Sequence, residues 1–218
     1  MARQTTHGKC NLCDKTFGKA AMTRHLAKCK EEHCKPGRTR IFHLQVEGYR
    51  DYWLHIEIPA SATLARLDRF LRNTWLECCG HLSAFTIDGA RYDVSPEPDP
   101  FKDTQDRSMK VALERVLEVG DKFDHEYDFG TTTELTLKVI AERTSALKAN
   151  DVKILARNDP PELLCVVCGQ AATQLCAYCV YEGNAFYCDE HVGEHQCSED
   201  AFLPVVNSPR MGMCGYTG

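Results

Sequence analysis

The spacing of cysteines and histidines is the feature that most constrains how this chain can fold. Of the thirteen cysteines, four lie in residues 10–34 and seven in residues 165–214, which leaves Cys78 and Cys79 alone in the middle. The first residues are polar, so we expect no secretory segment, and the apolar runs, such as residues 163–167, are too short to span a membrane. We therefore expect a cytoplasmic protein with reduced thiols, whose cysteine pairs bind metal instead of forming disulfides.

Metal ligands in the N-terminal segment, residues 1–38, predict a single zinc finger. They are Cys10, Cys13, His25 and Cys29. A Cys-x2-Cys knuckle turns two thiolates toward one ion, and a histidine and a cysteine four positions apart share one face of a helix. Phe17 and Met22 are expected in the core of the finger, and His33 and Cys34 remain alternatives for the last ligand.

Basic residues dominate the same segment. Residues 1–40 hold ten Lys/Arg against three Asp/Glu, a net charge of +7. Such an excess favours contact with the phosphates of nucleic acid, although one finger reads only about three base pairs and would bind weakly or with help. The side chains expected to make this contact from the finger helix are Lys19, Arg24, Lys28 and Lys30. A solvated basic helix without a ligand is the alternative.

The C-terminal segment, residues 160–218, predicts a module that holds two zinc ions. Its eight ligands, in chain order, are Cys165, Cys168, Cys176, Cys179, Cys188, His191, His195 and Cys197. These pairs resemble those of B-box and MYND-type cross-brace modules, and the likeness implies that the first pair shares an ion with the third and the second with the fourth. Sequential pairing stays open, and Cys214 is an alternative for closing the second set.

Together the two segments predict three zinc ions in structural sites. Full ligation by protein leaves no open position for catalysis. Residues 158–218 hold one Lys/Arg against eight Asp/Glu, a net charge of −7, which favours a protein partner over nucleic acid. The alternative is a cap that only stabilises the neighbouring domain.

The middle segment, residues 40–157, predicts an α+β domain with a central mixed sheet and one main helix, flanked by the two zinc modules. Alternating apolar residues predict strands at 41–46 and 52–58 around a turn at 47–51, and later strands at 83–87, 122–128 and 134–140. A helix is expected to begin at Ser61 or Thr63. Pro96, Pro98 and Pro100 predict an extended loop.

Several motifs in this segment resemble the Ri-plasmid ORF-3-like family, also labelled transposon passenger or resolvase-like. They run from Trp75-Leu76-Glu77 through His81-Leu82-Ser83 to Tyr127-Asp128-Phe129-Gly130, and the likeness covers roughly residues 40–143. It implies a compact α+β domain of plasmid, transposon and prokaryotic genomes without an assigned activity. The chain departs from the family at Thr131-Thr132-Thr133, where relatives carry acidic or tryptophan-containing residues.

Three hypotheses about function follow. The first is a non-enzymatic prokaryotic adaptor, in which the finger contacts nucleic acid and the acidic module contacts protein. The second is a metal-dependent nuclease or other phosphoryl-transfer enzyme, whose carboxylates would be Asp88, Asp124, Glu126 and Asp128. The alternative is structural, because Asp124, Glu126 and Asp128 would share one face of a strand, as the solvent face of a half-buried sheet does. The third is that both zinc modules only stabilise the middle domain.

Overall fold

A computed structural model describes residues 6–49, 52–97, 105–183 and 185–218. The chain forms two compact units, the first containing Met1–Thr74 and His81–Asp159 and the second Trp75–Gly80 and Pro160–Gly218. The predicted finger and middle domain therefore fall within one unit. Among the helices in the described ranges, none is both long and apolar enough to cross a bilayer.

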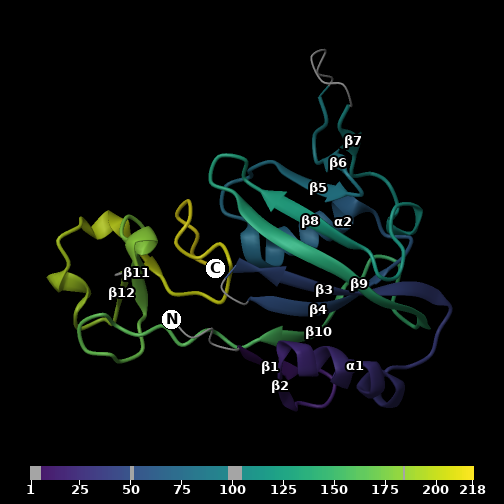
Figure 1. Ribbon diagram of the computed structural model, residues 1–218, viewed down its shortest axis with the longest axis horizontal. Helices are drawn as coiled ribbons and strands as arrows, with labels where there is room; N and C mark the ends of the chain where they lie inside the picture. Colours follow the sequence, from purple (N-terminus) through teal and green to yellow (C-terminus); the bar gives the residue numbers. More distant parts are fainter. Residues whose placement is uncertain (1–5, 50–51, 98–104, 184) are drawn as a thin grey trace. The chain divides into compact units, whose positions relative to one another are not determined.

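The first unit is built on a ten-stranded sheet in the order β2-β1-β10-β4-β3-β9-β8-β5-β6-β7 (Figure 1). Neighbouring strands are antiparallel except β6 and β7, which are parallel, so the predicted mixed sheet is confirmed. The large sheet and its few helices make this a sheet-dominated fold. The strands are β1 (His7–Cys10), β2 (Thr16–Gly18), β3 (Thr39–Gly48), β4 (Trp53–Pro59), β5 (Ser83–Ile87), β6 (Ala90–Asp93), β7 (Arg107–Ser108), β8 (Lys122–Tyr127), β9 (Thr133–Ser145) and β10 (Lys153–Asn158).

The apolar face of this sheet is covered by α2 (Leu64–Leu71). The helix begins at one of the two predicted caps, because the backbone N–H of Arg66 donates a hydrogen bond to Thr63 Oγ1 at 3.2 Å. On the sheet side of the helix, Asp68 Oδ1 lies 2.8 Å from His125 Nε2 of β8. The buried residues of the helix are Leu64, Leu67, Asp68 and Leu71.

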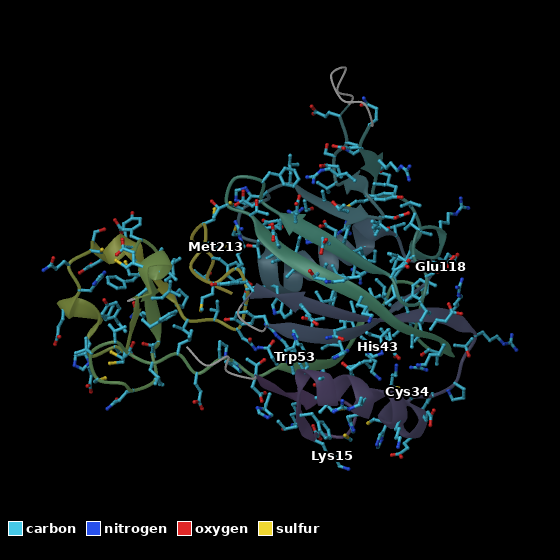
Figure 2. The ribbon with its side chains drawn as sticks, viewed as in Figure 1. Lys15, Cys34, His43, Trp53, Glu118 and Met213 are labelled. Atoms are coloured by element: carbon cyan, nitrogen blue, oxygen red, sulfur yellow. The ribbon has the colours of Figure 1, made fainter. Side chains whose placement is uncertain are left out.

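The opposite face of β3 is polar and is covered by α1 (Lys19–His33). Successive residues of a strand point to opposite faces, so His43 and Glu47 share the face away from the apolar core. Lys19 Nζ lies 2.7 Å from Glu47 Oε2, and Lys30 Nζ lies 2.9 Å from His43 Nδ1. Figure 2 labels His43 among the side chains of the sheet. The helix is thus attached to the sheet partly through buried polar contacts.

The predicted finger is continuous with the main sheet. β1 pairs with β10, with Gly8 opposite Asn158. A side chain at Gly8 would collide with the carbonyl oxygen of Arg157, so the close pairing requires glycine. One buried cluster joins the finger to the sheet, with Phe17 packed against it as predicted. Its members are Cys10, Met22, Leu26, Cys29, Trp53, Leu155 and Ala156.

The predicted strands of the middle segment are all present, with some shifted ends. β5 has the predicted bounds, whereas β3 and β9 are longer than predicted. β8 ends one residue early because Asp128 has a φ of 66° and turns the chain away from the sheet. Arg50 and Asp51 of the predicted turn, and Pro98 and Pro100 of the predicted loop, lie outside the described residues.

The second unit contains a three-stranded sheet in the order β12-β11-β13. The strands are β11 (Gln174–Cys176), β12 (Phe186–Tyr187) and β13 (Phe202–Pro204). The C-terminal tail packs onto this unit, because Met211 belongs to the same buried cluster as Leu175 and Val180. The segment Trp75–Gly80 is tied to the tail by a 2.6 Å hydrogen bond from Ser208 Oγ to the carbonyl oxygen of Trp75.

Candidate metal centres

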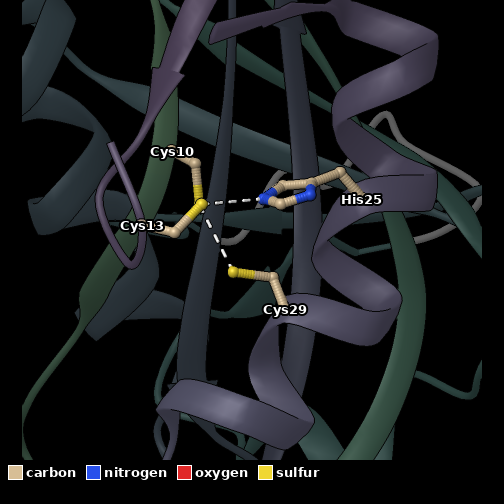
Figure 3. A group of neighbouring side chains, drawn as sticks. All are labelled: Cys10, Cys13, His25 and Cys29. Carbon is tan, nitrogen blue, oxygen red and sulfur yellow. Dashed lines mark hydrogen bonds between the residues drawn. The ribbon is translucent and has the colours of Figure 1, made fainter. Parts of the chain in front are cut away.

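The N-terminal ligand set lies where β1, its following turn and α1 meet (Figure 3). Cys10 ends β1, Cys13 follows in the turn, and His25 and Cys29 come from α1. Cys10 Sγ lies 3.9 Å from Cys29 Sγ, and Cys13 Sγ lies 3.2 Å from His25 Nε2. All four ligand atoms lie within 4.8 Å of one another. Neither alternative ligand from the end of α1 belongs to this group.

Burial and backbone amides act in opposite directions on the ligands of this set. Burial, followed by hydrogen bonds with Cys13 and Cys10, raises the pKa of Cys29 to about 12. The backbone N–H of Lys15 lowers the pKa of Cys13. Burial lowers the pKa of His25, which favours the neutral imidazole that coordinates metal. A divalent cation suits such a set because it replaces the thiol protons.

The eight C-terminal ligands form two groups that alternate along the chain. The first group is Cys165, Cys168, Cys188 and His191, and the second is Cys176, Cys179, His195 and Cys197. Within each group the ligand atoms lie within 4.8 Å of one another. The grouping is the interleaved one that the cross-brace likeness implies, and Cys214 lies in neither group.

Local contacts shift the pKa values of individual ligands in the C-terminal groups and orient one of the histidines. Burial tends to raise the pKa of Cys165, but hydrogen bonds from backbone amides outweigh it and lower that pKa to about 6. In the second group, burial, followed by hydrogen bonds with neighbouring thiols, raises the pKa of Cys179 to about 12. Tyr187 Oη lies 2.8 Å from His195 Nδ1, which leaves His195 Nε2 facing Cys179 at 3.4 Å. Such a partner on the second ring nitrogen fixes the orientation of a ligating histidine.

The distances within these groups fit tetrahedral zinc. A Zn–S bond of about 2.3 Å places two thiolates about 3.8 Å apart in a tetrahedron. The sulfur–sulfur distances are 3.9 Å for Cys10–Cys29, 3.7 Å for Cys168–Cys188 and 3.8 Å for Cys179–Cys197. Sulfur–nitrogen distances of 3.1 to 3.4 Å are slightly below the roughly 3.6 Å of full coordination. Four protein ligands per group leave no open position, so the groups are suited to structural metal.

The structure separates the basic residues predicted on the finger helix into two classes. Arg24 and Lys28 are exposed, lie four positions apart on α1 and have no ion-pair partner within the described ranges. Lys19 is half-buried and paired with Glu47. Lys30 is buried, so its predicted place on the helix surface is wrong. Burial lowers the pKa of Lys30. The negative charge of Glu57 acts in the opposite direction but offsets only part of the effect of burial.

A buried polar network beneath α1 has no counterpart among the predicted sites. His43 Nε2 lies 3.0 Å from His55 Nδ1, and Lys30 Nζ lies 4.0 Å from Glu57 Oε1. Arg143 holds Glu57 through two hydrogen bonds of 2.8 and 2.7 Å. Burial, reinforced by the charge of Lys30, lowers the pKa of His43 to about 2 and that of His55 to about 4. The sequence signal is the alternation of these polar residues with apolar ones in β3 and β4.

The four carboxylates of the enzymatic alternative have separate partners. Asp124 accepts a hydrogen bond from Thr136 at 3.0 Å, and Glu126 pairs with Arg91 at 2.8 Å. The third carboxylate of that set, at position 128, is buried and accepts a hydrogen bond from the backbone N–H of Gly130 at 3.0 Å. Asp88 occupies the turn between β5 and β6 with a φ of 47°. None of the ligand groups found in the described part of the chain includes any of them.

Comparison with known proteins supports the resemblance noted in the sequence. A family model described as plasmid pRiA4b ORF-3-like protein matches residues 42–170, which is more than half of the chain. A crystal structure of a protein of unknown function from Methanosarcina mazei Go1 is 15% identical and has a TM-score of 0.44, covering 56% of this chain and 70% of that chain. That similarity is too weak to support any functional conclusion. No curated protein matches the chain significantly.

Proposed function

The chain belongs to the plasmid pRiA4b ORF-3-like protein family, and we propose that it is a zinc-binding adaptor. In this proposal three structural zinc ions occupy the three groups that consist of the predicted ligands. The N-terminal finger contacts nucleic acid, and the acidic C-terminal unit contacts a protein. The family's plasmid origin supports a role connected with mobile elements, and the absence of a shared carboxylate group in the described residues favours an adaptor over a metal-dependent nuclease.

The exposed pair Arg24 and Lys28 is the observation that carries the nucleic-acid part of the proposal. Both side chains project from one face of α1 and neither has an ion-pair partner in the described ranges. Exposed Lys15 precedes the helix and adds a third positive charge on the same finger. Lysine and arginine side chains in this state bind phosphates by releasing counterions, without the need to break a salt bridge first.

Salt-dependent binding tests this part of the proposal. Fluorescence anisotropy with labelled single- and double-stranded oligonucleotides at low salt is expected to show binding by the full chain. The double variant R24A/K28A is expected to bind more weakly and to reduce the slope of log K against log salt by about 1.8. A matched control is K122A/K138A, which removes two exposed lysines from neighbouring positions of β8 and β9.

Two results would overturn the nucleic-acid part of the proposal. One is no binding by the full chain at low salt. The other is an equal loss of affinity in both double variants, because this would mean that only net charge matters. Either result would favour the purely structural alternative, which the continuity of the finger with the main sheet also supports.

The C-terminal unit combines exposed acidic and exposed apolar side chains. Leu164, Val166 and Val167 are exposed around the first cysteine pair. Exposed apolar side chains beside charged ones are typical of a surface that binds protein. The exposed acidic residues of this unit are Glu162, Glu182, Asp189, Glu190, Glu194, Glu199 and Asp200. We expect the partner surface to be basic with an apolar centre.

A pair of immobilised variants tests this surface in extracts of the native host. The variant V166S/V167S is expected to lose a basic protein that the wild type retains, while its zinc content stays unchanged. V119S is the control, because Val119 is an equally exposed valine in the first unit. Identical captured proteins for all three forms would contradict the proposed surface.

A further inference from the structure

Three cysteines outside the predicted zinc sites meet in the second unit. Cys78 and Cys79 follow the π-helical turn Arg72–Leu76, and Cys214 lies in the C-terminal tail. Cys79 Sγ lies 3.7 Å from Cys78 Sγ and 3.7 Å from Cys214 Sγ, and all three sulfur atoms lie within 4.8 Å of one another. Residues separated by more than 130 positions are thus brought to one point.

We propose that Cys78, Cys79 and Cys214 form an additional zinc site in the second unit. The sulfur–sulfur distances equal the 3.7 Å of Cys168–Cys188 and are close to the roughly 3.8 Å of a tetrahedral zinc–thiolate centre. They are far longer than the about 2.05 Å of a disulfide. This site is independent of the proposed contacts with nucleic acid and protein.

The backbone conformations at Cys214 and at Gly80 orient the thiols of the three cysteines. Cys214 has a φ of 48°, a conformation that side chains other than glycine rarely adopt. Left-handed conformations of this kind at non-glycine residues cluster at functional sites. On the other side, Gly80 has a φ of 83°, and its backbone N–H donates a 2.6 Å hydrogen bond to Glu77 Oε1. This bond closes the turn that presents Cys78 and Cys79.

Arg210 supplies the charge that such a site requires. Its side chain is fully buried, and its Nη2 donates to Cys78 Sγ at 3.5 Å. Three thiolates and one Zn²⁺ carry a net charge of −1, which one guanidinium neutralises. A buried cation is stable only beside negative charge. In turn, an N–H group that donates a hydrogen bond to a metal-binding sulfur stabilises the thiolate form of that sulfur. Arg210 is also the only Lys or Arg in residues 158–218.

The tail is fixed so that its cysteine reaches this point. The backbone N–H of Arg210 donates to Ser208 Oγ at 2.9 Å, and Ser208 Oγ donates in turn to the carbonyl oxygen of Trp75. A tetrahedral ion needs one more ligand. Water can supply it, as it does in zinc sites with three protein ligands. Binding of zinc releases the thiol protons to solvent.

Native mass spectrometry and thiol labelling of the full chain test the site. C79S, C214S and the double variant C79S/C214S are each expected to carry one zinc ion fewer than the wild type, because both cysteines serve one ion. C34S is the matched control and is expected to keep the full complement, since Cys34 lies outside every ligand group. Equal zinc content in the wild type and in C79S and C214S would overturn the proposal.

Labelling gives a second readout that does not depend on variants that fold poorly. Cys79 and Cys214 are exposed, so a maleimide would reach both quickly unless metal protects them. We expect Cys79 and Cys214 to resist labelling in the native protein and to react after a chelator removes the metal. Rapid labelling before chelation, or a mass two daltons lower that reveals a disulfide among the three, would overturn the proposal.

Discussion

His43 and His55 each make the stability of this protein depend on pH. Their folded-state pKa values of about 2 and about 4 lie below the ordinary value of 6.5. The unfolded chain therefore binds more protons below pH 6.5, and the folded state loses stability as the pH falls from about 6.5 toward 4. At pH 5 each buried imidazole is expected to cost roughly 2 kcal/mol relative to neutral pH.

The variant H55Q isolates this effect from acid release of metal. It removes one titrating group and leaves every metal ligand in place. The loss of unfolding free energy between pH 7 and pH 5, measured by urea denaturation, is expected to be smaller in H55Q than in the wild type by roughly 2 kcal/mol. An identical loss in both proteins would show that the histidines do not set the acid limit.

Asp68 and His125 form a buried pair that we expect to stabilise the fold. His125 is fully buried, and its Nε2 lies 2.8 Å from Asp68 Oδ1. D68A is expected to lower the free energy of unfolding by about 3 kcal/mol or more, because it leaves a buried polar group without its partner. D124A removes an exposed carboxylate from β8, the strand that contains His125. It is expected to change the free energy of unfolding by less than about 0.5 kcal/mol. Similar effects of the two variants in thermal or urea unfolding would contradict this role.

Single elements show which parts of the fold the sequence predicts and which it does not. β5 was predictable because Ser83–Ile87 is a short segment that contains three good strand formers, Phe85, Thr86 and Ile87. The pairing of β1 with β10 was not, because Cys10 and Ala156 meet only through a contact across most of the chain. The ligand spacing gave the members of the metal groups, but local spacing carries no sign that Lys30 turns inward. Lys30 turns inward because it contacts His43 on the polar face of β3, and no pattern within α1 itself indicates this contact.

Removal of metal tests how the finger is held to the sheet. We expect a chelator to increase amide hydrogen exchange in β1 and α1, because Cys10 and Cys29 lie in the buried cluster that joins the finger to Trp53. Exchange in β5 and β8 is expected to stay unchanged, since no ligand group includes a residue of either strand. Uniform exchange before and after chelation would show that packing alone holds the finger.

On the scale of the whole molecule, each of the two units of the proposed adaptor contains candidate metal-ligand groups. The first unit carries one ligand group within its sheet and helix, and the second carries two predicted groups and the proposed trio. Opposite charge divides the same chain, with +7 in residues 1–40 and −7 in residues 158–218. The family and the start of its match could be predicted from motifs, but the match runs to residue 170, beyond the predicted end near residue 143. The trio could not be predicted, because Cys214 has no spacing relation to Cys78 or Cys79.

Native mass spectrometry of two double variants distinguishes interleaved from sequential use of the eight C-terminal zinc ligands. In C168S/C188S both substitutions fall in one group, so this variant is expected to carry one zinc ion fewer than the wild type. In C168S/C179S they fall in different groups, so two ions are expected to be lost. Sequential pairing requires loss of two ions in C168S/C188S and of one ion in C168S/C179S. That result, or a wild-type protein without zinc, would rule out interleaved zinc sites.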